Sequence, residues 1–321
     1  MGRWSKIRQF LSSTDWNVYS FHPWPWQLPC HPYFVANPLQ NPDGHGGYSL
    51  RFPFDENGLP YRRVDGQPWY DPLLLSRYAF KMLQIATEEG DPEARRKGLT
   101  VLPFLVESGE RNGIWGRASD PRAMSRARPS CMIQGTVISA ILRLTEGDPG
   151  PRERRVIEAA RAWLVRPVEE GGVVSRLDGG PFLEEIPRVP PSHVLNGCIY
   201  GLFGLYDLAD TIGDERAAEM AIRVEETLVR TIDRFVTPTG WSWYALHVYG
   251  HRLVASLHYH RAHVLLLEVV ARRTGVERLR RVAQRWRVSL ARPASRVIVG
   301  TAKFAQVVLL RDILRLPLLE D

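Results

Sequence analysis

The sequence predicts a mainly α-helical protein: an (α/α) toroid of about four helical hairpins with a small N-terminal extended or β region. From Pro72 onward, a helix rich in small and aromatic residues is repeatedly followed by a more charged helix, with a period of roughly 60 residues. A glycine lies at the turn of each hairpin, which is typical of a helix end. If the hairpins close on themselves, the apolar helices form an inner ring and the charged helices an outer ring. The turn glycines are Gly90, Gly147, Gly213 and Gly275.

Residues 1–70 differ from the rest of the chain because they are rich in proline and tryptophan and have no helical period. We expect them to form an extended or β region that packs on the body, residues 71–321. A calcium site around Asp43, Asp55 and Glu56 is conceivable, but their spacing is not that of an EF-hand. We interpret them as solvated loop acids and predict no metal site.

The four hairpins are expected at residues 73–109, 130–165, 192–230 and 256–292. Their apolar helices come first, and the third begins at Ser192 after a proline-rich turn. Two of the connections between hairpins, 171–177 and 240–249, are predicted to be short strands. In a toroid such connections cross one rim and carry the site.

Bulk composition limits the class of partner. The chain has 321 residues, 42 basic and 35 acidic, and a formal net charge of +7, which suits an anionic partner. No nucleic-acid-binding motif accompanies this charge, so we expect no nucleic acid. No apolar run reaches the roughly 20 residues of a membrane span, and the N-terminus lacks a signal sequence. We therefore expect a soluble, cytoplasmic protein with no transmembrane segment. The sequence leaves both a monomer and a homodimer as alternatives. Cys131 and Cys198 are interpreted as buried free thiols.

The stretch 182–210 is the most informative part of the chain. It joins a carboxylate pair and a proline-rich turn to a helix with Gly197, Gly201 and Gly204, where close approach of another backbone or a ligand is the usual reason for glycine. Its motifs EE-x-P, VLNG and GLYDL resemble the C-terminal catalytic domain of the D-glucuronyl C5-epimerases. Residues 70–83 and 129–143 resemble two further helices of this family, so that the resemblance covers roughly 60–290. It indicates a minimal, bacterial version of the enzyme.

The resemblance implies catalytic roles for Glu185, Tyr244 and Tyr259. Epimerisation at C5 needs acid and base groups on opposite faces of the sugar and a cationic or hydrogen-bonding clamp on the carboxylate. A tyrosine is a weak base unless nearby cations lower its pKa. The YH-x-x-H sequence at Tyr259 matches the family closely, whereas the match around Tyr244 is looser. Where the family has a tyrosine after Glu185, this chain has Ile186.

Further residues on the same motifs are candidates for substrate binding. Asn196 is either a buried network residue or a donor to a sugar, while Tyr200 and Tyr206 are interpreted as core. Trp115, Trp241 and Trp243 are either stacking platforms for a sugar or core residues. The histidines lack the acid of a zinc motif, and the chemistry needs no cofactor. The predicted substrate-binding set is Arg77, Tyr78, Gln134, Asn196, Trp243, His247, His260 and His263.

The leading functional hypothesis is a uronate C5-epimerase that converts D-glucuronate to L-iduronate residues in an acidic polysaccharide containing glucuronate. A polysaccharide lyase or an unsaturated-glycan hydrolase is the alternative enzyme, because a lyase also begins by removing the C5 proton. An inactive glycan-binding homologue is the third reading.

Overall fold

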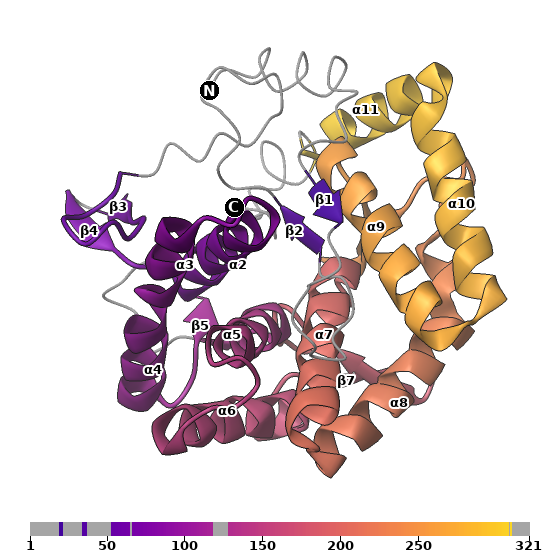
Figure 1. Ribbon diagram of the computed structural model, residues 1–321. Helices are drawn as coiled ribbons and strands as arrows, with labels where there is room; N and C mark the ends of the chain where they lie inside the picture. The colour runs from indigo at the N-terminus through magenta and orange to yellow at the C-terminus, as the bar shows by residue number, and fades with distance from the viewer. Residues whose placement is uncertain are drawn as a thin grey trace. The chain divides into compact units, whose positions relative to one another are not determined.

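The computed structural model describes residues 53–64, 66–117, 128–307 and 309, together with the backbone of two short strands nearer the N-terminus. The described chain is mainly helical, and its strands occur in two-stranded antiparallel pairs (Figure 1). It forms two compact units. The larger unit holds the described parts of Asp15–Pro191 and Gly197–Thr227, and the smaller unit holds Ser192–Asn196 and the described part of Leu228–Asp321.

The larger unit contains the first two predicted hairpins. The first is made of α2 (Pro72–Glu88), α3 (Pro92–Leu99) and α4 (Val101–Asn112), and the second of α5 (Cys131–Leu144) and α6 (Pro151–Leu164). Helix α2 packs against α3 and α5, and α5 packs against α6. Every residue of α5 is buried, whereas α6 buries only one stripe of residues. The predicted difference between an apolar inner helix and a charged outer helix is therefore confirmed for this hairpin.

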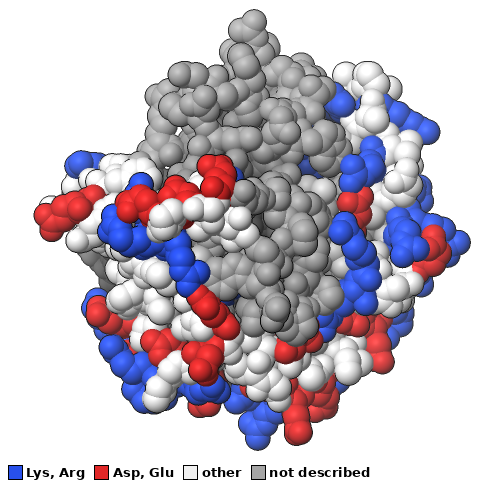
Figure 2. All heavy atoms as spheres, viewed as in Figure 1, with Lys and Arg blue, Asp and Glu red and all other residues white. Residues whose placement is uncertain are grey.

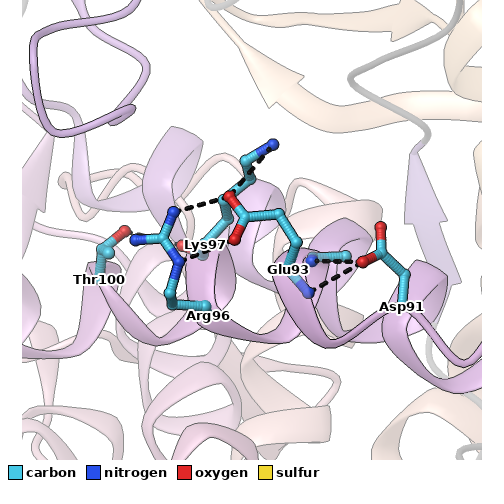
Figure 3. Close-up of polar contacts among 6 residues, drawn as sticks. Asp91, Glu93, Arg96, Lys97 and Thr100 are labelled. Carbon is cyan, nitrogen blue, oxygen red and sulfur yellow. Dashed lines mark hydrogen bonds and ion pairs between the residues drawn. The ribbon is translucent and has the colours of Figure 1, made fainter.

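The charged helix α3 shows how the second helix of a hairpin starts. Its N-cap residue is Asp91, whose carboxylate accepts hydrogen bonds from the backbone amides of Glu93 at 2.8 Å and Ala94 at 3.2 Å. Glu93 in turn forms ion pairs with Arg96 at 2.6 Å and Lys97 at 3.7 Å, one turn further on (Figure 3). The cap and the ion pairs stabilise a helix only eight residues long on its exposed side.

The outer part of the first hairpin was predicted as one helix, and this prediction was wrong. The structure divides it into α3 and α4 at Thr100. Pro103 lies in the first turn of α4, and a proline there has no amide to donate to the carbonyl of Leu99. Its ring would also collide with that carbonyl, so a continuous helix through Thr100 is disfavoured.

Short strand pairs connect these helices. The described strands of the larger unit are β1 (Tyr19–Phe21) with β2 (Phe34–Ala36), β3 (Arg62–Val64) with β4 (Gln67–Trp69), β5 (Gly116–Arg117) with β6 (Arg128–Pro129), and β7 (Val174–Leu177) with β8 (Gly180–Leu183). A short 3-10 helix, η3 (Val168–Glu170), precedes β7. The predicted strand at 171–177 is confirmed in β7.

The acids considered for calcium divide between described and undescribed residues. Asp43 lies outside the described residues. The carboxylate of Asp55 accepts hydrogen bonds from the backbone amides of Asn57 and Leu59 and from the hydroxyl of Tyr70 at 2.8 Å. Asp55 thus organises a local turn.

The third hairpin consists of α7 (Leu195–Ile212) and α8 (Glu215–Thr231). A fully buried ion pair joins α7 to α5: the Arg143 guanidinium lies 2.6 Å from the Asp207 carboxylate, and both side chains are 1% exposed. The expected start of α7 at Ser192 was wrong by three residues. Val194 instead forms a β-bridge with Ala245, and His193 has a φ of 53°, so the chain becomes helical only at Leu195.

The smaller unit holds the fourth hairpin. It contains a 3-10 helix, η4 (Ile232–Phe235), the strand pair β9 (Trp243–Val248) and β10 (His251–Val254), and the helices α9 (Leu257–Thr274), α10 (Glu277–Ala291) and α11 (Pro293–Val307). Helix α10 packs on both α9 and α11 (Figure 1). The predicted strand at 240–249 is confirmed in β9. Helix α11 begins at Pro293, whose fixed φ suits the first turn of a helix.

The turn glycines behave as the sequence predicts. Gly90, Gly147, Gly213 and Gly275 have φ values of 65°, 83°, 69° and 68°. Only glycine adopts this left-handed conformation without a steric penalty. These four positions therefore determine where each apolar helix stops and the charged helix after it begins.

Candidate active site

The predicted site residues form two clusters, and each lies within one unit. The carboxylate cluster of the larger unit consists of Glu184, Glu185, Arg77 and Tyr200. The aromatic cluster of the smaller unit consists of Ser242, Tyr244, Tyr259, His260 and His263, joined by Asn196.

The carboxylate cluster begins where β8 ends. Glu184 is fully buried: its backbone pairs with Val173 and with Cys131 at 2.7 and 3.1 Å, and its carboxylate accepts a hydrogen bond of 2.7 Å from the Ser175 hydroxyl. These bonds hold the chain on both sides of the carboxylate pair. Glu185 follows directly and is 3% exposed.

The glycines of α7 let Glu185 lie against the helix. A Cβ added at Gly197 would be 2.4 Å from the Cβ of Glu185 and 2.7 Å from its Oε2. Gly201 meets Cys131 in the same way, and Gly204 meets the backbone of Gly135. The prediction that close approach explains these glycines is confirmed, and at Gly197 the neighbour is a candidate catalytic side chain.

Arg77 and Tyr200 complete the carboxylate cluster. The phenol of Tyr200 forms a hydrogen bond with Arg77, and the charges of Arg77 and Glu185 both act on it. Burial, opposed by Arg77 and assisted by the charge of Glu185, raises the pKa of Tyr200 to about 12. At neutral pH the phenol therefore keeps its proton and can act as a hydrogen-bond donor.

Sequence reasoning missed Tyr200, which was interpreted as a core residue. A signal was present, because Tyr200 lies three residues after Gly197 and therefore on the same side of α7 as Glu185. The partner Arg77 comes from α2 and could not be assigned to Tyr200 from local spacing.

The two thiols lie beside this cluster. Cys131 and Cys198 are buried free cysteines, as predicted, and the Cys131 Sγ lies 3.1 Å from the carbonyl oxygen of Gly197. Burial raises the pKa of each thiol, so both stay protonated and act as packing groups.

The aromatic cluster is built by β9 and the start of α9. Helix α9 is capped by Ser256, whose hydroxyl accepts a hydrogen bond from the backbone amide of Tyr259 at 3.3 Å. The ring of Tyr259 meets the ring of Tyr244, with centroids 4.6 Å apart and planes inclined at 54°. Tyr244 is 1% exposed, while Tyr259 is half-buried. The two predicted catalytic tyrosines therefore lie side by side.

Two buried histidines lie behind the tyrosine pair. The Ser242 hydroxyl oxygen is 2.8 Å from the Nδ1 atoms of both His260 and His263. Burial, with a smaller contribution from His258, lowers the pKa of His263 from 6.5 to about 3. Burial, followed by the neighbouring His263, lowers the pKa of His260 well below 6.5. Both imidazoles are neutral at pH 7.

Asn196 reaches this cluster from the first turn of α7. The carbonyl of Ser192 accepts hydrogen bonds from the amides of Leu246 and His247 at 3.2 and 3.1 Å, which attaches the segment before α7 to β9. The side-chain amide of Asn196, 3% exposed, then lies 3.5 Å from the Nε2 of His263. The VLNG sequence thus places the side-chain amide of Asn196 next to the buried imidazole of His263.

Other predicted binding residues lie apart from these contacts. Gln134 is fully buried, and its side-chain amide is hydrogen bonded to the backbone of Trp115. Tyr78 is 3% exposed and packs on Phe54, with ring centroids 5.9 Å apart. His247 is half-buried on β9.

The three tryptophans divide between core and surface. Trp115 and Trp241 are buried, and their indole nitrogens donate to the backbone carbonyls of Leu105 and Ala255 at 2.9 Å. They are core residues. Trp243 is half-buried, and the Arg252 guanidinium lies 6.0 Å from its ring centroid.

The described residues include neither a candidate metal centre nor a candidate membrane span. Among them, no group of three or more histidine, cysteine or acidic side chains is arranged to hold a metal ion. No helix in the described part of the chain is long and apolar enough to cross a membrane.

Comparisons of structure bear on the fold. A cellobiose 2-epimerase from Bacillus thermoamylovorans superposes with a TM-score of 0.55 at 12% identity, over 75% of this chain and 67% of that one. A cellobiose 2-epimerase from Spirochaeta thermophila gives 0.52 at 16% identity, over 74% and 64%. At these identities the likeness shows the fold alone, and the prediction of an (α/α) toroid is confirmed.

Comparisons of sequence bear on the family. Residues 129–288 match the family described as D-glucuronyl C5-epimerase C-terminus. A D-glucuronyl C5-epimerase of Caenorhabditis elegans is 31% identical over an alignment of 173 residues, which covers 49% of this chain and 28% of the nematode protein. The matching region thus spans little more than a quarter of that relative. The family match, residues 129–288, includes Glu185, Tyr244 and Tyr259. Through residues 129–288, the chain belongs to the D-glucuronyl C5-epimerase family.

Proposed function

We propose that the chain is the catalytic region of a uronate C5-epimerase, which converts D-glucuronate to L-iduronate residues within an acidic polysaccharide. The observation that carries the proposal is the contact between Tyr244 and Tyr259, 4.6 Å between ring centroids, in front of two neutral imidazoles. Phenols held in this way can exchange a proton with a carbon acid, while a sugar-binding module has no need of them.

In the proposed reaction, the two acid–base roles that the family resemblance implies fall to Glu185 and Tyr259. Glu185 removes the C5 proton, and the electron pair of the C–H bond moves into the carboxylate to give an enolate-like intermediate. Tyr259 then donates its phenolic proton to C5 from the other face, and the electron pair returns to form the new C–H bond. Solvent exchange resets both groups, and the same residues with reversed roles catalyse the reverse reaction. Tyr244 supports Tyr259 by holding its ring.

Negative charge develops on the uronate carboxylate during this reaction and has to be stabilised. We assign this role to Arg77, whose guanidinium is fixed by its hydrogen bond with Tyr200 beside Glu185. A guanidinium and a protonated phenol are both donors, so together they suit a carboxylate that becomes more negative. Within their own units, Asn196, His247, Trp243, Tyr78 and Gln134 are proposed to bind or support the polymer.

The charge of the chain suits a polyanion. Its formal net charge is +7, and Figure 2 shows lysine and arginine side chains over much of the surface formed by α10. A basic surface raises the local concentration of an acidic polymer and accelerates its binding. The proposal therefore expects an anionic polysaccharide rather than a neutral one.

The experiment that tests the proposal is incubation of the protein with a heparosan-like polymer in D₂O, followed by NMR of the polymer. Deuterium at C5 together with iduronate signals supports the epimerase. Unsaturated uronate, detected by its ultraviolet absorbance, would instead identify a lyase, and binding without any exchange would identify a glycan-binding homologue. Exchange in a polymer without uronate would contradict the assigned substrate.

A further inference from the structure

The Ser242 hydroxyl lies between two imidazole nitrogens in a site that excludes water. Ser242, His260 and His263 are each 0% exposed. The hydroxyl carries one proton, while each of the two Nδ1 atoms lies 2.8 Å away. Hydrogen bonds of this length to two nitrogens constrain which atoms carry protons, because a hydroxyl can donate to only one of them.

The tautomer of His260 follows from its backbone contacts. The amide of Ser242 donates to the Nδ1 of His260 at 3.1 Å, so this nitrogen has no proton. The Nε2 faces the carbonyl oxygen of Trp286 at 3.1 Å, and a carbonyl oxygen can only accept. His260 is therefore the neutral tautomer with its proton on Nε2. Stacking on Trp241, with centroids 3.7 Å apart and planes inclined at 14°, holds the ring in this orientation.

The tautomer of His263 follows in turn. The Nδ1 of His260 has one lone pair, which the Ser242 hydroxyl proton shares with the Ser242 amide; with the proton turned away, a lone pair of the hydroxyl oxygen would face this nitrogen at 2.8 Å. The hydroxyl oxygen is then left as the acceptor for His263, whose Nδ1 must carry a proton. Since His263 is neutral at pH 7, its Nε2 keeps a lone pair.

The lone pair on Nε2 determines how Asn196 is oriented. The side-chain oxygen of Asn196 is placed 3.5 Å from this nitrogen, but the oxygen and nitrogen of a side-chain amide are assigned from the hydrogen-bond network and can be exchanged. A lone pair on His263 requires the NH₂ group of Asn196 on this side and directs the amide oxygen away from it.

The same hydrogen bonds attach β9, which carries Tyr244, to α9, which carries Tyr259. Ser242 is two residues before Tyr244 in an extended segment, so the two side chains point to the same side. His263 is four residues after Tyr259 in α9, so these two lie on one face of the helix. The contact between Ser242 and His263 therefore sets the spacing at which Tyr244 meets Tyr259.

We propose that Ser242 and His260 form a hydrogen-bonded relay that holds His263 as the Nδ1–H tautomer, and that this relay positions Tyr244 against Tyr259 and orients the amide of Asn196. Ser242, His260 and His263 are positioning residues in this assignment. Its catalytic consequence rests on the proposed epimerase function, whereas the tautomers do not depend on any activity.

The test is ¹⁵N NMR of the full chain labelled at histidine, which distinguishes protonated from unprotonated ring nitrogens. We expect His260 to carry its proton on Nε2 and His263 on Nδ1, with His263 assigned through a His263→Gln variant. A proton on the Nε2 of wild-type His263 would overturn the relay whatever the protein catalyses.

Two variants make the test sharper. Ser242→Ala removes the hydroxyl and should shift His263 toward the Nε2–H tautomer, while Ser242→Thr, which keeps a hydroxyl, should retain Nδ1–H. Ser289→Ala is the matched control: it removes a second buried serine hydroxyl, 3.2 Å from the other nitrogen of His260, and leaves the Trp286 carbonyl as acceptor. It should leave the His263 tautomer unchanged.

The rate of C5 exchange gives the second readout. Ser242→Ala should lower kcat by about tenfold, the effect of losing one well-aligned hydrogen bond, with KM unchanged, and Ser242→Thr should restore much of it. If the tautomers agree with expectation but Ser242→Ala has wild-type kcat, the positioning role is wrong. If the wild-type protein shows no exchange at all, the proposed function fails while the tautomer assignment stands.

Discussion

Tyr259 has the more accessible phenol of the pair, because its side chain is half-buried whereas that of Tyr244 is 1% exposed. A group that exchanges protons with a substrate needs this access, so we assign the acid/base role to Tyr259. Tyr259→Phe keeps the ring contact with Tyr244 and removes only the hydroxyl. We expect the C5 exchange rate to fall by about 10²–10⁴-fold, with polymer affinity nearly unchanged.

The matched control for this substitution is Tyr249→Phe, because Tyr249 is 36% exposed at the turn between β9 and β10. It should exchange C5 hydrogen at the wild-type rate. A Tyr259→Phe variant as active as this control would remove Tyr259 from the mechanism, and Tyr244 would become the residue to test.

The two adjacent glutamates have different surroundings and should respond differently to substitution. Glu184 is held by Ser175 and is fully buried, whereas Glu185 lies against Gly197 within the field of Arg77 and Tyr200. Glu185→Gln should lower the exchange rate by about 10²–10⁴-fold and leave the unfolding midpoint in urea nearly unchanged. Glu184→Gln should show the larger loss of stability, because it weakens a buried hydrogen bond to a charged acceptor. The reverse pattern would exchange the roles of the two residues.

At the residue scale, the motifs could be predicted from sequence but the partners could not. The EE pair, VLNG and YH-x-x-H are local patterns. The part played by Ser242 depends on two histidines 18 and 21 residues further along the chain, and no local pattern marks it. Ile186 replaces the family tyrosine, yet a phenol, that of Tyr200, still lies close enough to Glu185 for the carboxylate to raise its pKa.

Helix α7 shows how an element can be adapted to a site. Glycine costs the interior of a helix about 1 kcal/mol relative to alanine, but a Cβ at position 197 would lie 2.4 Å from Glu185. Overpacking of this kind typically costs about 1–3 kcal/mol, which outweighs the gain in helix propensity. We therefore expect Gly197→Ala to lower the free energy of unfolding by about 1–2 kcal/mol and to reduce C5 exchange by displacing Glu185.

Gly98 in α3 is the comparison for this prediction. The nearest atom to a Cβ added there is the Met82 Cβ at 3.3 Å, a contact that a small adjustment can relieve. Gly98→Ala should change the free energy of unfolding by less than about 1 kcal/mol and leave exchange unaltered. Urea unfolding of the two variants measures both values, and equal stability would contradict the clash at Gly197.

Element boundaries were predictable where one residue type decides them. The four turn glycines all have positive φ, so the ends of the inner helices followed from sequence. The break at Thr100 depends on Pro103. This proline is a local signal from which the break could have been predicted. The late start of α7 depends on the bridge between Val194 and Ala245, which lies 51 positions away and has no local signature.

At the scale of the whole molecule, the repeat of hairpins determined the fold class because it reflects burial. A helix buried on all sides, such as α5, has to be apolar throughout, and its outer partner needs only one apolar stripe. Charge and composition are averages over the chain, so they could indicate an anionic partner but could not place a single side chain. Buried polar clusters such as Ser242, His260 and His263 reduce hydrophobic burial. Their members come together only through the packing of strand and helix, so the cluster could not be predicted from local sequence.

These buried histidines should make the stability of the whole molecule sensitive to acid. The pKa of His263 is lowered from 6.5 to about 3 in the folded protein, so between these values the unfolded chain binds a proton that the folded chain does not. The free energy of unfolding therefore falls as the pH is lowered from about 6.5 toward 3. The slope approaches about 1.4 kcal/mol per pH unit for one histidine, and between pH 7 and pH 5 the loss is about 2 kcal/mol. His260, whose pKa is also lowered, acts in the same direction.

Urea unfolding at pH 7 and pH 5 measures this dependence. His263→Gln removes the titrating group, so its free energy of unfolding should lose about 2 kcal/mol less between the two pH values than that of the wild-type protein, whatever its absolute stability. His251→Gln, which removes an exposed histidine from β10, should keep the wild-type difference. A wild-type protein equally stable at both pH values would mean that the unfolded and folded chains bind the same number of protons. If His263→Gln and the wild-type protein lost the same free energy between the two pH values, the His263 imidazole would not stay neutral in the folded protein, and the arrangement of protons in the relay would be wrong.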